Sequence, residues 1–114
     1  MLKTKSVYEA NVPEDGIRIL VMRKWPRGVS KDKVDRWIKE LGPSTELLND
    51  WTEHRINWIE YEKRYRREME DTEKRQSIKK IAELSEKKVV SLLCWEKSDE
   101  YCHRKLLKEL IEKL

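Results

Sequence analysis

Two nearly continuous apolar segments, residues 17–22 and 89–94, constrain the fold more than any other feature of this chain. Both are rich in Val, Ile and Leu, and neither alternates regularly between apolar and polar positions, which is typical of strands covered on both faces. A long interval with helical spacing separates them. Because parallel strands need a crossover that usually contains a helix, we expect the two segments to pair in parallel and to end at the same edge of one sheet.

The interval between the two segments predicts several helices. Ser30 is a suitable N-cap for a helix over residues 31–41, which Gly42-Pro43 would end. The apolar face of that helix would consist of Val34, Trp37, Ile38 and Leu41. The other expected helices are a short one capped by Ser44 or Thr45, a long one over 53–69, one beginning near Asp71 and Thr72, and a C-terminal one capped by Ser98 or Asp99.

A further short strand is expected near the N-terminus, over residues 2–8, close to an edge of the sheet. At 114 residues the chain can bury a modest core without disulfides or metal. We therefore predict a single domain over residues 1–114 with an α/β fold, in which a small, mostly parallel sheet of about three strands is flanked by four to five helices.

Composition limits the class of protein. Charged residues make up 42% of the chain, yet the apolar 38% is arranged periodically, which argues against disorder. The bias toward Lys, Glu and Arg favours a thermophilic source. A net charge of +4 permits a small anionic ligand or nucleic acid as partner but demands neither. No apolar run approaches the ~20 residues that span a bilayer, so we expect a cytoplasmic protein without a membrane partner.

The segment from residue 94 to residue 104 carries most of the chemistry. It joins a predicted strand to a predicted helix, and open α/β sheets bind ligands at such junctions. The candidate catalytic residues are Cys102, His103, Glu96 and Cys94. Cys102 would be a nucleophile whose pKa is lowered by the helix N-terminus and nearby cations, His103 an acid or base, and Glu96 the group that orients it.

Structural roles remain open for the same residues. Free cysteines are often simply buried, and Cys94 and Cys102 could instead form a disulfide. Glu96 could serve only in a salt bridge. A metal site is not expected, because neighbouring residues 102 and 103 rarely chelate one ion within a helix and paired Cys-x-x-Cys spacing is absent.

The loop over residues 23–28 is expected at the same edge of the sheet. Arg23, Arg27 and Arg104 are candidates for binding an anion, because guanidinium groups match phosphate and carboxylate geometry. Trp25 is a candidate for stacking on a base. The structural alternatives are ion pairs for the arginines and packing on the sheet edge for Trp25.

Three ordered motifs resemble the YeaO-like proteins, a group of small uncharacterised proteins with a domain of unknown function, number 488. Residues 19–31 end a strand in Arg and continue with Trp-Pro-Arg-Gly-x-Ser-Lys, residues 41–47 read Leu-Gly-Pro-Ser-Thr-Glu-Leu, and Cys94-x-Glu96 precedes Cys102-His103-Arg104. The resemblance implies a small α/β protein and no particular activity. Relatives usually have Asp where this chain has Met22, so a role for that carboxylate is not carried over.

Together these features favour an anion- or nucleotide-binding enzyme with a Cys/His/Arg site at the C-terminal edge of the sheet. Two alternatives remain: a nucleic-acid-binding module that uses the Trp25-Pro26-Arg27 loop, and a structural protein with a Cys94–Cys102 disulfide. The chain has no Walker-type loop or dinucleotide fingerprint, so no cofactor is indicated, and no feature predicts an oligomeric state.

Overall fold

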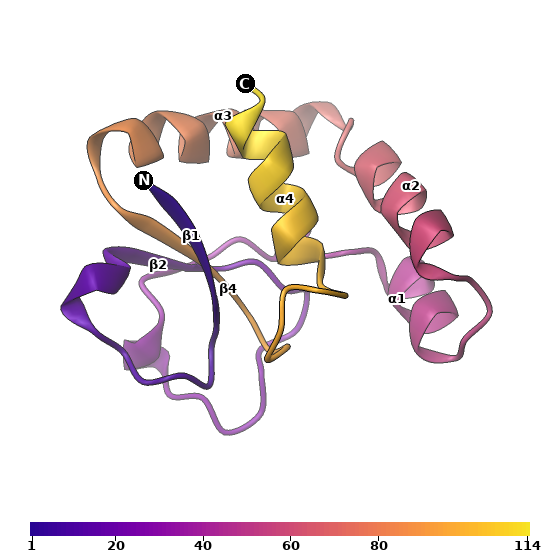
Figure 1. Ribbon diagram of the computed structural model, residues 1–114, viewed down its shortest axis with the longest axis horizontal. Helices are drawn as coiled ribbons and strands as arrows, with labels where there is room; N and C mark the ends of the chain where they lie inside the picture. The colour runs from indigo at the N-terminus through magenta and orange to yellow at the C-terminus, as the bar shows by residue number, and fades with distance from the viewer.

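The computed structural model describes residues 1–114 and contains one sheet of four strands and four α-helices (Figure 1). The strands are β1 (Leu2–Ser6), β2 (Ile17–Leu20), β3 (Arg36–Trp37) and β4 (Val90–Cys94). The helices are α1 (Thr45–Thr52), α2 (Trp58–Glu68), α3 (Thr72–Lys87) and α4 (His103–Glu112), and short 3₁₀ turns lie at Pro13–Asp15, Lys31–Lys33 and Lys39–Leu41. None of the helices combines the length and apolar character needed to cross a membrane.

The sheet confirms the predicted α/β class. Its order is β1-β4-β2-β3, and every neighbouring pair is parallel. The two apolar segments form the central strands β2 and β4, which pair from Ile17 with Val90 to Leu20 with Leu93. β1 is an edge strand, as expected. With β3, the sheet has one strand more than the three expected.

The two faces of the sheet are covered differently. On one face Ile19 and Leu92 join a core of 14 buried residues contributed largely by the helices. On the other face Leu20 and Leu93 pack with Val7 and Val29 in a smaller cluster. Figure 1 shows the helices gathered to one side of the strands and loops on the other. The central strands are therefore apolar on both faces although helices cover only one.

The expected helix over residues 31–41 is wrong. This segment forms two 3₁₀ turns with β3 between them. The backbone N–H groups of Asp35 and Ile38 donate to the carbonyl oxygens of Arg18 and Leu20, each at 2.9 Å. The segment thus pairs with the open edge of β2. The backbone hydrogen bonds formed there stabilise the extended conformation more than the helical spacing of its apolar residues, a local preference, stabilises a helix.

The helix predicted over 53–69 begins later than expected. α1 ends at Thr52, His54 has a left-handed backbone with φ of 58°, and α2 begins at Trp58. Asn57 caps α2 by accepting a hydrogen bond from the N–H of Glu60 at 2.9 Å.

The caps predicted for α1 and α3 are confirmed, and the cap predicted for α4 is wrong. Ser44 caps α1 and Asp71 caps α3, each by a side-chain oxygen that accepts a backbone N–H. α4 begins at His103 with Cys102 in the N-cap position, and no side chain caps it. The predicted cap Asp99 instead accepts hydrogen bonds from Arg104 and Thr4. A buried guanidinium without a charged partner costs more free energy than a helix end without a cap.

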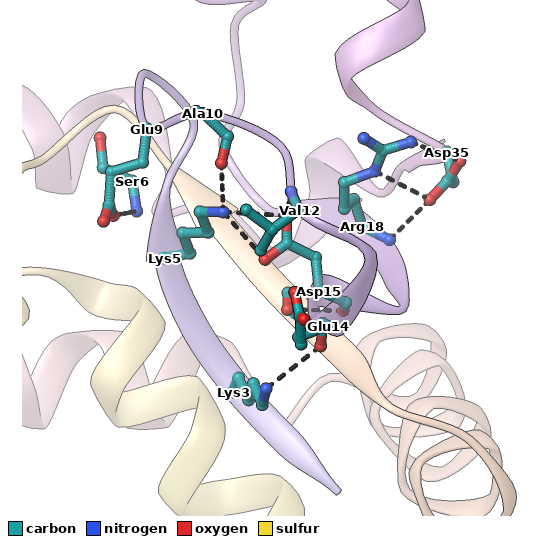
Figure 2. Close-up of polar contacts among 11 residues, drawn as sticks. Lys3, Lys5, Ser6, Glu9, Ala10, Val12, Glu14, Asp15, Arg18 and Asp35 are labelled. Atoms are coloured by element: carbon teal, nitrogen blue, oxygen red, sulfur yellow. Dashed lines mark hydrogen bonds and ion pairs between the residues drawn. The ribbon is translucent and has the colours of Figure 1, made fainter.

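A partly buried ion pair joins β1 to the turn before β2. Lys5 Nζ lies 2.8 Å and 2.9 Å from the two carboxylate oxygens of Asp15, as Figure 2 shows. The same carboxylate accepts the N–H of Val12 at 3.0 Å. These contacts of Asp15 stabilise the 3₁₀ turn that leads into β2.

Candidate functional site

The ends of β4 and α4 bring two thiols and an imidazole together. Cys94 is the last residue of β4, Cys102 is the N-cap of α4 and His103 is its first residue. His103 Nδ1 lies 4.0 Å from Sγ of each cysteine, and the three ligand atoms all lie within 4.8 Å of one another. All three side chains are buried. We call these residues the Cys/His cluster.

A backbone contact sets the tautomer of His103. Its Nε2 lies 2.5 Å from the carbonyl oxygen of Val21, the residue that follows β2. A carbonyl can only accept a hydrogen bond, so Nε2 carries the hydrogen and the neutral ring keeps its lone pair on Nδ1, between the two thiols. The arrangement depends on β2 and β4 ending at the same edge of the sheet.

The two thiols differ in acidity. The pKa of Cys94 is lowered, chiefly by its interaction with the Cys102 thiol; burial opposes this, while the backbone of Glu96 and the charge of Arg104 reinforce it. The pKa of Cys102 is raised by the same interaction and by burial. The cluster therefore favours Cys94 as the thiolate, whereas the sequence pointed to Cys102.

Arg104 organises the loop between β4 and α4 from within. Its side chain is only 2% exposed. Nε donates to Asp99 at 2.6 Å, and Nη1 donates to the carbonyl oxygens of Glu96 at 2.7 Å and Cys94 at 3.3 Å. The guanidinium is therefore largely occupied by protein oxygens and supplies positive charge near Cys94.

Two small cavities meet at the cluster. One of about 190 Å³ is bordered by Arg23 and Lys24, and the other of about 100 Å³ by Glu96 and Tyr101. Both are lined by Leu48, Cys94, Trp95 and His103. Volumes of this size suit a small ligand or the reactive end of a larger one.

The structure brings some of the predicted site residues together and separates others. Cys94, Cys102, His103 and Arg104 form one contiguous group, and Glu96 borders the smaller cavity. Arg23 borders the larger cavity, although two of its N–H groups donate to the carbonyl oxygens of Pro43 at 2.9 Å and Gly42 at 3.1 Å. A close backbone approach allows this contact, because a Cβ on Gly42 would lie 2.6 Å from the backbone N of Arg23.

Arg27 and Trp25 do not border either cavity of the cluster. Arg27 is exposed, and its carbonyl oxygen accepts a hydrogen bond from the hydroxyl of Tyr8 at 2.8 Å. Trp25 packs against Trp37, with ring centroids 5.4 Å apart. The loop over 23–28 therefore reaches the cluster only through its first two residues.

Sequence reasoning missed three contributors to the site. Lys24 follows Arg23 and Trp95 follows Cys94, so their positions beside predicted site residues could have indicated them. The carbonyl of Val21 gave no signal, because every residue has a carbonyl and only the fold shows which one faces His103.

The Cys/His cluster also has the ligand set that soft divalent ions such as zinc prefer. Two sulfurs and an imidazole nitrogen would leave a fourth position open. The objection that residues 102 and 103 cannot chelate together within a helix does not hold, because Cys102 precedes α4 in an extended conformation.

Comparison with known proteins agrees with the resemblance seen in the sequence. Residues 2–114 match the DUF488-N3a family, described as the active DUF488-N3 subclade. The chain is 32% identical over 115 residues to the uncharacterised protein YeaO of Escherichia coli K12, covering 99% of this chain and 98% of that protein. It is 36% identical over 83 residues, 70% of each chain, to the uncharacterised proteins Rv3073c of Mycobacterium tuberculosis and Mb3100c of Mycobacterium bovis. No solved structure matches the chain.

Proposed function

The chain belongs to the DUF488-N3a family, and we propose that it is a small enzyme that uses the Cys/His cluster to act on an anionic ligand. The observation that carries this proposal is the lone pair of His103 Nδ1, 4.0 Å from two thiols, at the wall of a cavity bordered by Arg23 and Lys24. The description of the family as active supports an enzyme but names no reaction.

Cys94 is the proposed nucleophile, because it lines both cavities. In group transfer, Cys94 gives its proton to His103 Nδ1, and its sulfur forms a bond to an electrophilic carbon or phosphorus of the ligand. The bond to the leaving group breaks, and the leaving group takes the proton from His103. Water then splits the sulfur–ligand bond, its hydroxyl going to the ligand and its hydrogen to sulfur.

The other residues of the site would bind the anionic ligand or adjust the reactive groups. Arg23 has five N–H groups and uses two on backbone carbonyls, so the others can face an anion. Lys24 is exposed and forms no ion pair within the chain, which leaves its ammonium available at the cavity. The Cys102 thiol lies within 4.8 Å of Cys94 Sγ and lowers the pKa of Cys94. The role of Glu96 in orienting His103 stays a prediction.

The test compares a negatively charged and a neutral alkylating reagent. Iodoacetate and iodoacetamide are reacted with the protein at pH 7, and peptide mapping gives the rate at each cysteine. We expect Cys94 to react first and its iodoacetate-to-iodoacetamide rate ratio to exceed that of glutathione. Lys24→Gln should lower the ratio by about fivefold, equivalent to about 1 kcal/mol for one charge near the surface. Lys31→Gln is the matched control, because Lys31 lines a different groove.

His103→Gln tests the base separately, since it should slow both reagents by about a hundredfold without changing their ratio. A ratio equal to that of glutathione, or labelling of Cys102 before Cys94, would overturn the proposal. So would one zinc per chain in the isolated protein that blocks both thiols until it is chelated, because the cluster would then be a metal site.

A further inference from the structure

A groove of about 540 Å³ lies apart from the Cys/His cluster, over β3 and the loop before it. It is larger than either cavity at the cluster. Its lining residues are Trp25, Lys31, Val34, Asp35, Arg36 and Trp37. The proposed thiol chemistry uses none of them.

Two indole rings form most of the apolar part of this groove, and Val34 completes it. Trp25 and Trp37 meet edge to face, with centroids 5.4 Å apart and planes inclined at 74°. Trp25 Nε1 donates to the carbonyl oxygen of Val29 at 2.8 Å, and Trp37 Nε1 donates to that of Met22 at 2.7 Å. Trp37 nevertheless remains 40% exposed. Because each ring is held by its N–H group, its apolar surface is presented to solvent in a fixed orientation.

The positive charge of the chain is concentrated around the same groove. Residues 25–39, which surround the groove, include five basic and two acidic residues, a net charge of +3 out of the +4 that the whole chain carries. Asp35 is paired with Arg18, as Figure 2 shows, and Asp32 accepts a hydrogen bond from the hydroxyl of Ser30. Both carboxylates are therefore already engaged.

The cations beside the indoles are not engaged in the same way. Lys31, Arg36 and Lys39 form no ion pair within the chain. Lys39 Nζ lies 5.4 Å from the centroid of the Trp37 ring, within the range of a cation–π contact. A phosphate beside a base stacked on Trp37 would thus find an ammonium close by.

We propose that this groove binds single-stranded nucleic acid, with a base stacked on Trp37 and phosphates held by Lys31, Arg36 and Lys39. Exposed aromatic rings interleaved with unpaired cations are the combination that single strands require, because every unpaired base offers a flat face next to a phosphate. The bases of a duplex are already stacked on each other and cannot use the rings.

Other occupants fit less well. A second copy of this chain would bring the same positive charge against itself. β3 is only two residues long, which is too short an edge for an added peptide strand. The inference does not depend on the proposed thiol chemistry, so the binding test can fail or succeed independently of the alkylation test.

The experiment is fluorescence anisotropy with labelled oligothymidylate and oligouridylate of about twelve nucleotides, within the span that such sites cover. We expect binding at low salt that weakens steeply as salt is raised. Trp37→Leu should weaken it about tenfold, and Trp37→Phe, which keeps a stacking face, should weaken it much less. Arg36→Gln should reduce the slope of log affinity against log salt by about one.

Two matched controls keep the result specific. Trp95→Leu removes an exposed indole at the Cys/His cluster, and Lys79→Gln removes an exposed cation on α3; neither should change the affinity. Circular dichroism of each variant checks that it is folded. Absence of binding at low salt overturns the proposal. So does equal weakening by Trp37→Leu and Trp95→Leu, or affinity for duplex that matches affinity for the single strand.

Discussion

At the scale of single residues, His103 is the most informative position. Its Nε2 is committed to a backbone carbonyl, so its Nδ1 has only the two thiols before it. Cys94 and Cys102 are chemically identical in the sequence, and the structure makes them unequal. Cys94 ends a strand and has a lowered pKa, while Cys102 precedes a helix and has a raised pKa.

The inequality predicts a pH dependence. The pKa of Cys94 is lowered chiefly by the Cys102 thiol, so alkylation of Cys94 should reach half its limiting rate at a lower pH than alkylation of an ordinary thiol does. Cys102→Ala removes this thiol and should raise that midpoint, whereas Cys102→Ser keeps a hydrogen-bond donor and should raise it less. Rates of alkylation by iodoacetamide between pH 5 and pH 10 measure both values. An identical midpoint in the wild type and Cys102→Ala would contradict the assignment.

At the scale of elements, contacts between a strand and a turn decide how the chain enters the central strand β2. The turn Pro13–Asp15 precedes β2, and Lys5 of β1 holds it through Asp15 (Figure 2). Burial raises the pKa of Asp15, but hydrogen bonds from Lys5 and Val12 outweigh burial, and the net pKa is lowered below 3.8. The carboxylate is therefore more stable as an anion in the folded chain than in the unfolded chain.

This ion pair predicts how stability changes with pH. A lowered folded-state pKa stabilises the fold fully above the unfolded value of 3.8, and the contribution is lost as pH falls through the lower folded value. Asp15→Asn should cost about 1–3 kcal/mol at pH 7. The difference from the wild type should shrink as pH falls below 3.8. Urea unfolding of both proteins at pH 7 and at a pH below 3.8 measures this difference. A difference that persists unchanged in acid would contradict the role given to the charge.

The elements also show where local pattern and tertiary pairing disagree. The sequence predicts Ser44 and Asp71 correctly as caps, because each side chain accepts a hydrogen bond from the N–H group only three residues further along the chain. The helix expected over 31–41 failed because its competitor, the open edge of β2, lies far away in sequence. The spacing of apolar residues within a segment carries no information about hydrogen bonds to a strand elsewhere in the chain.

At the scale of the whole molecule, one sheet organises both the core and the candidate site. The larger core lies between the helices and one face of the sheet, and the smaller cluster lies under the loops on the other face. β4 takes part in both, through Leu92 and Leu93. Neither face can lose its covering without exposing the central strand.

This shared strand predicts cooperative unfolding. We expect residues 1–114 to unfold in one two-state transition, as a single domain would, because loss of either cluster exposes β4. Tryptophan fluorescence, which includes Trp25 and Trp37 at the groove, and far-ultraviolet circular dichroism, which reports mainly the helices, should give the same urea midpoint. Two separated transitions would contradict a single domain.

The sequence by itself determined the central parallel pair, most helices and the edge where the site lies. These follow from local spacing, short-range caps and the requirement that parallel strands cross over. It also singled out Cys94, Cys102 and His103 as candidates, since their residue types carry the chemistry wherever they lie.

Only the tertiary structure decided which atoms meet. The bond of His103 to the carbonyl of Val21, the unequal thiols, the burial of Arg104 and the separation of Trp25 from the cluster all join residues across different elements. Such contacts depend on distances in the folded chain, and their partners are often backbone atoms that every residue has. That is the physical reason why a sequence pattern can nominate a site but cannot assign its hydrogen bonds.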